Sequence, residues 1–126
     1  MSDIIRFKEI MSPEAILECR DWAPVGSRVT CDPPPMDTDE DWLLEVKSLV
    51  VIEEILKRGG WYCGTSLKNC PEFASFRLGD VNLIATQDRS FFDRFMAASS
   101  VAKRFNLLIK ADRITLFRAV LYGDRA

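Results

Sequence analysis

The sequence contains no histidine among its 126 residues, which excludes every catalytic dyad or triad that uses an imidazole base. It has four cysteines but no C-x2-C pair, so the usual spacing of a zinc site is missing as well. No apolar run approaches the roughly 20 residues that cross a membrane. The N-terminal segment lacks the basic stretch and the long apolar core of a signal peptide. These absences predict a cytoplasmic protein whose cysteines are free thiols.

The chain also lacks a strong net charge, since the formal value is only −2. The charges are unevenly spread, however: residues 1–56 carry 5 basic and 13 acidic side chains, whereas residues 101–126 carry 6 basic and 2 acidic ones. A generic nucleic-acid-binding domain is basic as a whole, so the net charge does not indicate nucleic acid as a partner. The uneven spread favours an acidic metal site that faces a basic wall. The alternative is that these are solvated faces of unlike composition.

The composition and length are those of an ordinary folded domain. Hydrophobic residues make up 48% of the chain, and the length predicts one domain over residues 1–126. Apolar periodicity and the turn signals Gly59-Gly60 and Gly79-Asp80 predict alternating helices and strands, which is the α/β (α+β) fold class. We expect helices at about 12–22, 48–58, 90–105 and 111–121, and strands just before Gly26 and at 41–46, 61–65, 73–78 and 81–86.

Two short motifs carry the chemistry. Asp39 and Asp41 stand two residues apart, directly before an apolar run. On a strand such side chains share a face, with Cα atoms about 6.5 Å apart, so both carboxylates can reach one hard cation. A Gly26-Ser27 turn precedes them and can bring backbone N–H groups close to a phosphate. Together these residues predict a site for a metal-bound nucleoside triphosphate, NTP, although acidic loops and Gly-Ser pairs are also common by themselves.

The order of these motifs resembles the signature of the nucleotidyltransferase superfamily, which has the polymerase-beta-like fold. The resemblance covers about residues 12–122 and implies a small mixed sheet with helices on one face. It implies an enzyme that uses Mg²⁺ (or Mn²⁺) to move a nucleoside monophosphate from NTP to an acceptor hydroxyl. Asp39 and Asp41 would hold the metal, while Gly26 and Ser27 would hold the β- and γ-phosphates. The sequence does not identify the acceptor.

The chain departs from the family pattern at two positions. Glu40 stands where the family usually has an apolar residue, so it either perturbs the strand or adds a third local carboxylate. Asn82 stands where the family carries its third catalytic carboxylate, and an amide cannot take a proton as a carboxylate does. Either the nearby Asp80 substitutes, or the acceptor supplies its own base, or catalysis has been lost. We predict a site role for Asn82, as a hydrogen-bond partner of a ligand or of a carboxylate.

Basic side chains supply the remaining candidates for nucleotide binding. Arg28 follows the Gly-Ser turn and can pair with phosphate oxygens. Lys110 and Arg113 lie at the start of the last expected helix, where cations oppose the helix dipole. That placement favours a role at the site, as in related enzymes where a helical lysine contacts the triphosphate. The alternative is that these cations are surface charges or partners of the acidic N-terminal half.

A second resemblance comes from segments 73–77, 81–84, 91–95, 110–117 and 120–123. They look like those of small nucleotidyltransferase-like proteins encoded by tailed bacteriophages. This resemblance implies a location in the cytoplasm of the host cell and adds a host protein to the expected partners. It also implies an alternative function, in which a catalytically degenerate nucleotidyltransferase fold serves as an accessory protein that binds a nucleotide or a host protein.

Overall fold

The computed structural model describes residues 2–36, 38–65 and 72–123. Within them, five strands form one sheet in the order β1-β2-β5-β4-β3. The β2–β5 pair at the centre is parallel and the other pairs are antiparallel. The elements are α1 (Asp3–Ile10), α2 (Pro13–Glu18), β1 (Cys19–Val25), α3 (Ser27–Thr30), β2 (Glu40–Val46), α4 (Leu49–Arg58), β3 (Tyr62–Thr65), β4 (Ala74–Leu78), β5 (Val81–Thr86), α5 (Arg89–Arg104) and α6 (Lys110–Tyr122).

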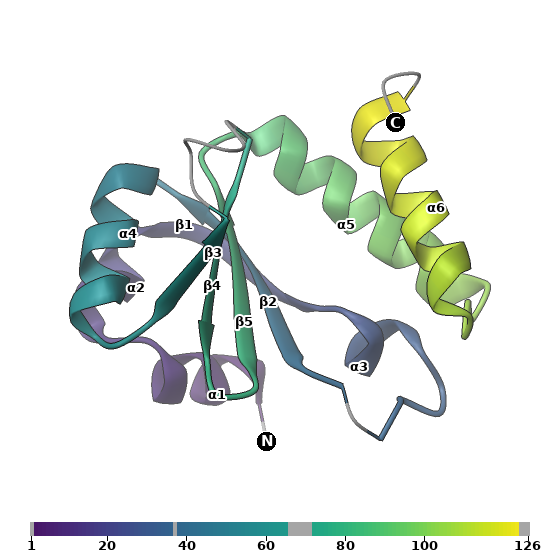
Figure 1. The fold of residues 1–126 in the computed structure, drawn as a ribbon, viewed down its shortest axis with the longest axis horizontal. Helices are drawn as coiled ribbons and strands as arrows, with labels where there is room; N and C mark the ends of the chain where they lie inside the picture. The colour runs from purple at the N-terminus through teal and green to yellow at the C-terminus, as the bar shows by residue number, and fades with distance from the viewer. Residues whose placement is uncertain (1, 37, 66–71, 124–126) are drawn as a thin grey trace.

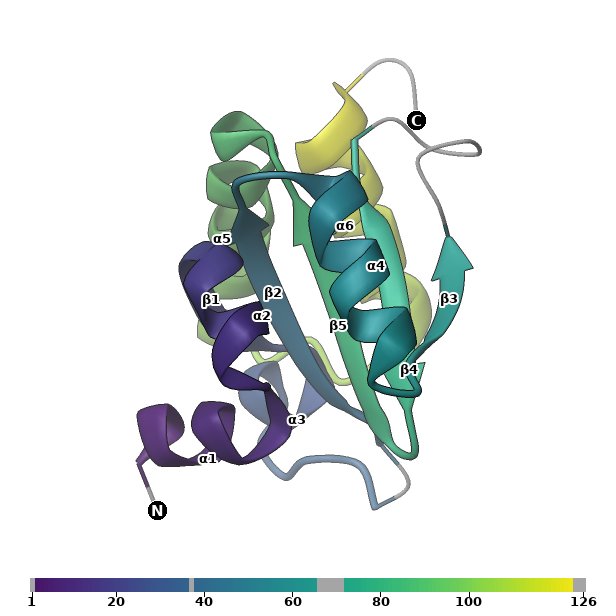
Figure 2. The same cartoon turned by 90° about the vertical axis from the view of Figure 1, so that its left-hand side faces the viewer.

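Helices cover both faces of this mixed sheet (Figures 1 and 2). α1, α2 and α4 lie on one face, and α5 and α6 lie on the other. The expected α/β class with a small mixed sheet is confirmed, but the expectation of helices on one face is wrong. The reason is the alternation along β2: Trp42 and Leu44 enter the core under α4, whereas Leu43 enters the core under α5. A strand that is apolar on both sides needs cover on both sides.

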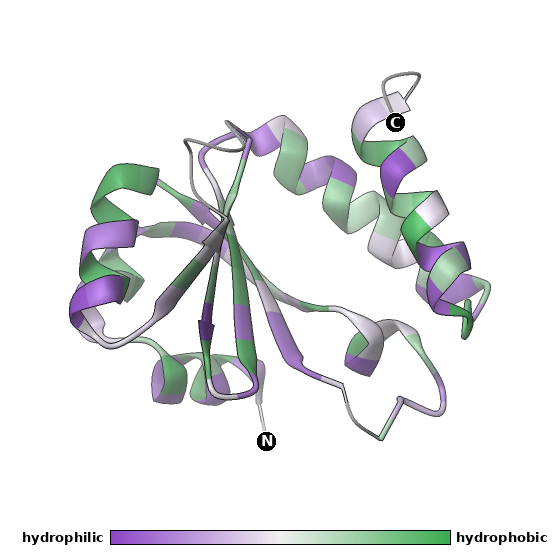
Figure 3. Cartoon of the chain, in the orientation of Figure 1, coloured by the Kyte–Doolittle hydropathy of each residue, from purple (hydrophilic) through white to green (hydrophobic). Residues whose placement is uncertain are grey.

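The two hydrophobic cores hold different sets of helices on the sheet. The first core packs α1, α2 and α4 on the sheet and includes Phe7, which stacks on Trp22 with ring centroids 4.5 Å apart. The second core contains Leu43, Phe91 and Leu121 and attaches the C-terminal helices. Hydrophobic colour along β2 gives way to hydrophilic colour at the end of the strand nearest α3 (Figure 3). That polar end of the sheet is where the motif carboxylates lie.

α6 is held mainly by α5. Phe117 of α6 meets Phe95 of α5 edge to face, with centroids 5.0 Å apart. Arg94 of α5 donates a hydrogen bond to the backbone carbonyl of Leu121 near the end of α6. The C-terminal helix is therefore joined to the sheet through side-chain packing around α5 rather than through strand hydrogen bonds.

Several predicted elements are confirmed, one helix boundary is wrong, and two short helices were not predicted. α4 begins after the cap Ser48, and the hairpin around Gly79-Asp80 joins β4 to β5. The helix expected at 12–22 ends at Glu18, because the next residues pair with β2 as an edge strand. Pro24 fits there, since an edge strand tolerates a missing N–H donor. α1 and α3 were not expected, because α1 buries just Phe7 and α3 is four residues long.

Two expectations from composition can also be checked on the described residues. Cys19 and Cys31 are free thiols, as predicted, while Cys70 lies outside the described residues. No helix in residues 2–36, 38–65 and 72–123 is both long and apolar enough to cross a membrane.

Glu40 lies on the α1 side of the sheet, away from the motif carboxylates. Its two carboxylate oxygens accept hydrogen bonds from Arg6 Nε and Nη2 at 2.8 and 2.7 Å, and Trp42 Nε1 donates to it at 3.0 Å. The hydrogen bond from Arg6, followed by that from Trp42, lowers the pKa of Glu40. Glu40 thus neither distorts β2 nor joins the acidic motif, and it fastens α1 to the sheet.

We expect Glu40→Gln to lower the free energy of unfolding at neutral pH by about 1 kcal/mol, because the two charge-assisted hydrogen bonds from Arg6 are weakened at a partly buried site. The folded-state pKa of Glu40 lies below its ordinary value of 4.5. Its stabilisation is therefore complete above that pH and is lost as the pH falls through the lowered value. Denaturant titrations from pH 3 to 8 should show that the difference in free energy of unfolding between wild type and Glu40→Gln disappears at acidic pH. Glu9→Gln, which removes the exposed 3.6 Å contact to Arg6, is the control. A difference in free energy of unfolding that stays the same at every pH would contradict this account.

Candidate functional site

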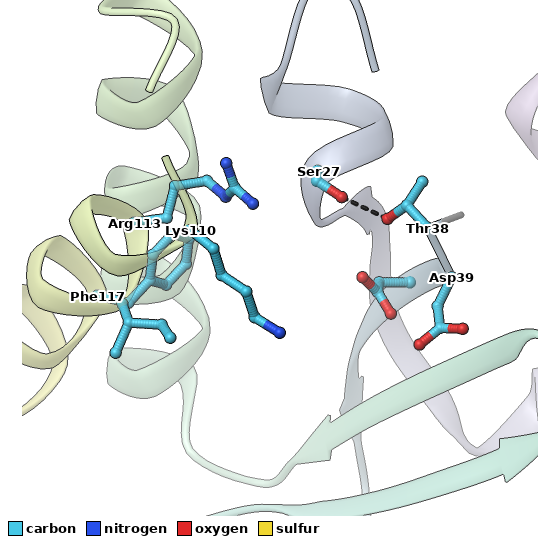
Figure 4. A pocket seen from close by; sticks show the side chains of 8 residues that line it. Ser27, Thr38, Asp39, Lys110, Arg113 and Phe117 are labelled. Carbon is cyan, nitrogen blue, oxygen red and sulfur yellow. Dashed lines mark hydrogen bonds between the residues drawn. The ribbon is translucent and has the colours of Figure 1, made fainter. Parts of the chain in front are cut away.

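A pocket of about 340 Å³ lies between the polar end of the sheet and α6 (Figure 4). Ser27, Thr38, Asp39 and Asp41 line one side of it, and Lys110, Arg113, Ile114 and Phe117 line the other. The four α6 residues are spaced by three, one and three positions, which places them on one helix face. The structure therefore brings five of the predicted site residues into one cavity: Ser27, Asp39, Asp41, Lys110 and Arg113.

Gly26 meets the Asp41 carboxylate directly. Its φ of 83° lies in the region that favours glycine. A Cβ atom placed at Gly26 would lie 2.9 Å from Asp41 Cγ, so a larger residue would displace the carboxylate. Val25, one residue earlier, pairs with Asp41 across the β1–β2 ladder. The Gly-Ser turn and the second motif carboxylate are thus in contact, as the sequence spacing predicts.

Thr38 closes the loop that follows α3 onto the same turn. Its hydroxyl is hydrogen-bonded to that of Ser27, and its carbonyl accepts from Arg28 Nε and Nη2 at 3.2 and 2.9 Å. Arg28 does not line the pocket. It borders a second cavity of about 320 Å³ near α1, and its guanidinium lies 3.9 Å from both Glu40 and Asp80. Its visible role is to hold the loop in place.

A row of polar side chains crosses the central strands on the α5 face. In the ladders Asp41 of β2 pairs with Asn82 of β5, and Asn82 pairs with Arg77 of β4. Arg77 Nη2 donates to Asp39 Oδ2 at 2.8 Å. The sequence analysis missed both Arg77 and Thr38 as site residues. Counting back from the Gly79-Asp80 turn gives the Arg77–Asn82 pairing, so the signal for Arg77 was present in the hairpin.

The pKa values of the two motif carboxylates, Asp39 and Asp41, are shifted in opposite directions. Burial raises the pKa of Asp41 to about 6, against hydrogen bonding from Asn82 and with a further contribution from the charge of Asp39. The hydrogen bond from Arg77 lowers the pKa of Asp39, and the charges of Arg77, Arg28 and Lys110 act in the same direction. The folded structure therefore favours the ionised form of Asp39, whereas ionising the buried Asp41 lowers the stability of the fold. A cation arriving at Asp41 would remove that loss of stability.

The donor set fits a hard divalent cation that brings its own ligands. In the described part of the chain no group of three or more His, Cys, Asp or Glu side chains is placed to hold a metal. The oxygens available are the carboxylates of Asp39 and Asp41, the hydroxyls of Ser27 and Thr38, and the amide of Asn82. Mg²⁺ is commonly bound by one or two carboxylates together with waters and substrate phosphates. These residues therefore suit Mg²⁺ arriving with a phosphate.

Asp80 does not replace the missing third carboxylate in this arrangement. It lies in the turn between β4 and β5, its side chain is 76% exposed, and its nearest cation is Arg28 at 3.9 Å. Asn82 keeps the position beside Asp41, where its hydrogen bond favours the ionised form of that carboxylate. The predicted role of Asn82 as a partner of a carboxylate agrees with this placement.

We expect Asp41→Asn to stabilise the protein above pH 6 in the presence of EDTA. Folding disfavours the ionised form of Asp41, since its pKa is about 6 when folded and 3.8 ordinarily. The resulting cost begins as the pH rises through 3.8 and is complete above about 6. At one pKa unit per 1.36 kcal/mol, the gain is on the order of 1–3 kcal/mol. Thermal unfolding from pH 4 to 8 measures it.

The melting temperature of Asp41→Asn should rise above that of wild type as the pH increases, and the two should be equal near pH 4. Asp39→Asn is the matched comparison, and its effect has the opposite sign, because its pKa is lowered in the folded state. An Asp41→Asn protein that is less stable than wild type at every pH would show that Asp41 is not strained by burial.

No protein-family model matches the sequence, and no curated protein matches it. Among solved structures, the conserved protein GrpB from Enterococcus faecalis is similar to this chain, with a TM-score of 0.61 and 12% sequence identity. The match covers 98% of this chain and 91% of GrpB. At this identity the likeness shows the fold alone. The shared fold is the mixed α/β sheet with flanking helices described above. It indicates neither metal-dependent activity nor an origin in a bacteriophage.

Proposed function

We propose that this protein is a Mg²⁺- or Mn²⁺-dependent nucleotidyltransferase that moves a nucleoside monophosphate from NTP to an acceptor hydroxyl. The observation that carries the proposal is one pocket with Asp39 and Asp41 on one side and Lys110 and Arg113 on the other. A metal–triphosphate complex presents a cation and several anionic oxygens together. An acidic wall opposite a basic wall is complementary to both.

Each wall has a definite task in this proposal. Asp39 and Asp41 would hold the divalent cation, which supplies Lewis-acid neutralisation of the phosphates. Ser27 turns its hydroxyl to a β- or γ-phosphate oxygen, and Gly26 allows the backbone to approach closely. Lys110 is exposed and extends across the pocket toward the acidic side (Figure 4). It pairs with phosphate as a mobile point charge.

Arg113 acts from a fixed position. Its Nη1 donates to the backbone carbonyl of Leu107 at 2.8 Å and lies 3.2 Å from Cys31 Sγ. This anchor leaves the other guanidinium N–H groups to meet a phosphate. The anchor also gives Arg113 a structural role at the α5–α6 connection, so Lys110 is the better residue for testing ligand binding.

The transfer forms one bond and breaks one. The acceptor hydroxyl oxygen attacks the α-phosphorus, the bond from that phosphorus to the β-bridging oxygen breaks, and pyrophosphate leaves. The hydroxyl proton needs an acceptor, and Asn82 cannot serve. The proton must pass to a group on the acceptor or to water. We therefore expect slow turnover with ordinary alcohols and faster turnover with acceptors that carry their own base.

The direct test is thermal unfolding with Mg²⁺ or Mn²⁺ and each common NTP, together with a pyrophosphate-release assay. Wild type should gain stability when metal and NTP are present together, and it should release pyrophosphate slowly. The Asp39→Asn/Asp41→Asn double variant should keep its fold but lose the metal-dependent gain. Asp112→Asn, which removes an exposed acid from the first turn of α6 outside the pocket, is the matched control. An undiminished gain in the double variant would exclude these carboxylates as the metal site.

The basic wall is tested by the same binding assay at two salt concentrations. Lys110→Gln should weaken NTP binding, and the loss should be larger at low salt because exposed charges are screened. Arg118→Gln removes a cation from an exposed position of α6 that does not line the pocket. It should leave NTP binding unchanged.

A second function, a catalytically degenerate fold that binds a nucleotide or a host protein, is favoured by one specific observation. Asn82, not a carboxylate, pairs with Asp41, and Asp80 is turned away. In this case wild type would bind metal and NTP without releasing pyrophosphate. The bacteriophage resemblance belongs with this alternative, and the host protein would be its partner.

Asn82→Asp separates the two functions. If only the base is missing, the new carboxylate beside Asp41 should raise pyrophosphate release by roughly 10²- to 10⁴-fold, the usual range for general-base catalysis. Asn82→Ala is the control, because it removes the amide without supplying a base. Metal-dependent NTP binding without pyrophosphate release in wild type and Asn82→Asp alike would establish the binding function.

A further inference from the structure

Arg77 already supplies a cation to the acidic motif. Its Nη2 lies 2.8 Å from Asp39 Oδ2, and the two side chains are 45% and 42% exposed. The bond to Asp39 raises the pKa of Arg77, and Asp41 adds to that effect. Because Arg77 stands on β4 in line with Asn82 and Asp41, the strand register holds its Cα beside the site.

This contact occupies an oxygen that a divalent cation would need. A carboxylate oxygen that accepts a hydrogen bond from a guanidinium must give up that bond to bind a metal fully. The positive charge of Arg77 also repels an incoming cation. In the described residues the site offers two carboxylates and no third, so losing Asp39 leaves Asp41 alone. The bare site is therefore poorly suited to binding metal by itself.

We propose that Arg77 competes with the divalent cation for Asp39, and that the phosphates of an incoming NTP take Arg77 over, so that metal and nucleotide bind together. The inference rests on the proposed function, since it concerns Asp39 of the same pocket; Arg77 contacts Asp39 without lining the pocket itself. A phosphate accepts a fork of two hydrogen bonds from a guanidinium, whereas Asp39 accepts from one nitrogen of Arg77. The exposed side chain is free to make that exchange.

The arrangement has a thermodynamic consequence. If NTP removes Arg77 from Asp39, NTP raises the affinity for metal, and metal must raise the affinity for NTP by the same factor. Couplings of this kind are commonly 5- to 150-fold. Arg77 thus acts as a positioning residue for the metal site: it keeps the motif neutralised until the ligand that needs the metal arrives.

The test measures Mn²⁺ binding by electron paramagnetic resonance, with and without a non-hydrolysable NTP analogue. Wild type should bind Mn²⁺ weakly alone and about tenfold more tightly with the analogue. Arg77→Gln should bind Mn²⁺ alone about tenfold more tightly than wild type, and the analogue should add less than it adds in wild type, because its phosphates still bind the metal but no longer displace Arg77. Arg20→Gln removes an exposed cation of β1 and should behave like wild type. Thermal unfolding in EDTA checks that each variant is folded.

A further variant shows whether the gain runs through Asp39. Adding Asp39→Asn to Arg77→Gln should abolish the improved Mn²⁺ binding. If wild type binds Mn²⁺ and Arg77→Gln binds it equally or less tightly, the competition is wrong while the proposed function stands. If neither protein binds Mn²⁺ with or without the analogue, the proposed metal site itself is wrong, and the role of Arg77 falls with it.

Discussion

The close contact between the Gly26 backbone and the Asp41 carboxylate is the constraint on which the candidate site depends. It is possible because β1 and β2 pair so that Val25 meets Asp41, and because a glycine follows Val25 with a positive φ. The same pairing puts Trp42 and Leu43 into opposite cores. One ladder register therefore decides both the packing of the sheet and the position of the acid. A slip of one residue would turn Asp41 to the α1 side and would bury Glu40 against α5.

Local sequence patterns correctly predicted one helix and one hairpin of the fold. The apolar spacing of 48–58 and the Gly59-Gly60 signal after it predicted α4, and the turn at Gly79-Asp80 predicted the β4–β5 hairpin, because these signals are local. The stretch after Glu18 was misread as helix, because Pro24 was taken as the residue that ends the helix begun at Ser12. Pairing with β2 makes it a strand instead, and Leu17 at the end of α2 is left 73% exposed. Competition between elements in space is not visible in a local pattern.

Charge and spacing predicted which side chains would gather, and the neighbours that were missed lie in the ladder. Asp39, Asp41, Ser27, Lys110 and Arg113 line one pocket, and their role in binding a ligand stays a prediction. Arg77 was missed because an arginine on a strand is ordinarily a solvated residue, and its meaning depends on what the neighbouring strand places beside it. Glu40 was misjudged for the same reason: its face on β2 aims it at Arg6. In both cases cross-strand position, rather than residue type, determines the role.

The two walls of the pocket are attached to the molecule in different ways. The acidic wall sits at the end of hydrogen-bonded strands, whereas the basic wall belongs to α6, which rests on α5 through the Phe95–Phe117 contact and the bond from Arg94. Substitutions in the α5–α6 interface can thus change the width of the pocket without disturbing the acids. The position of the acids and the width of the pocket are therefore set by separate groups of residues. Repacking this one pair of helices would therefore shift the basic wall while the strand ends that carry the acids stay in place.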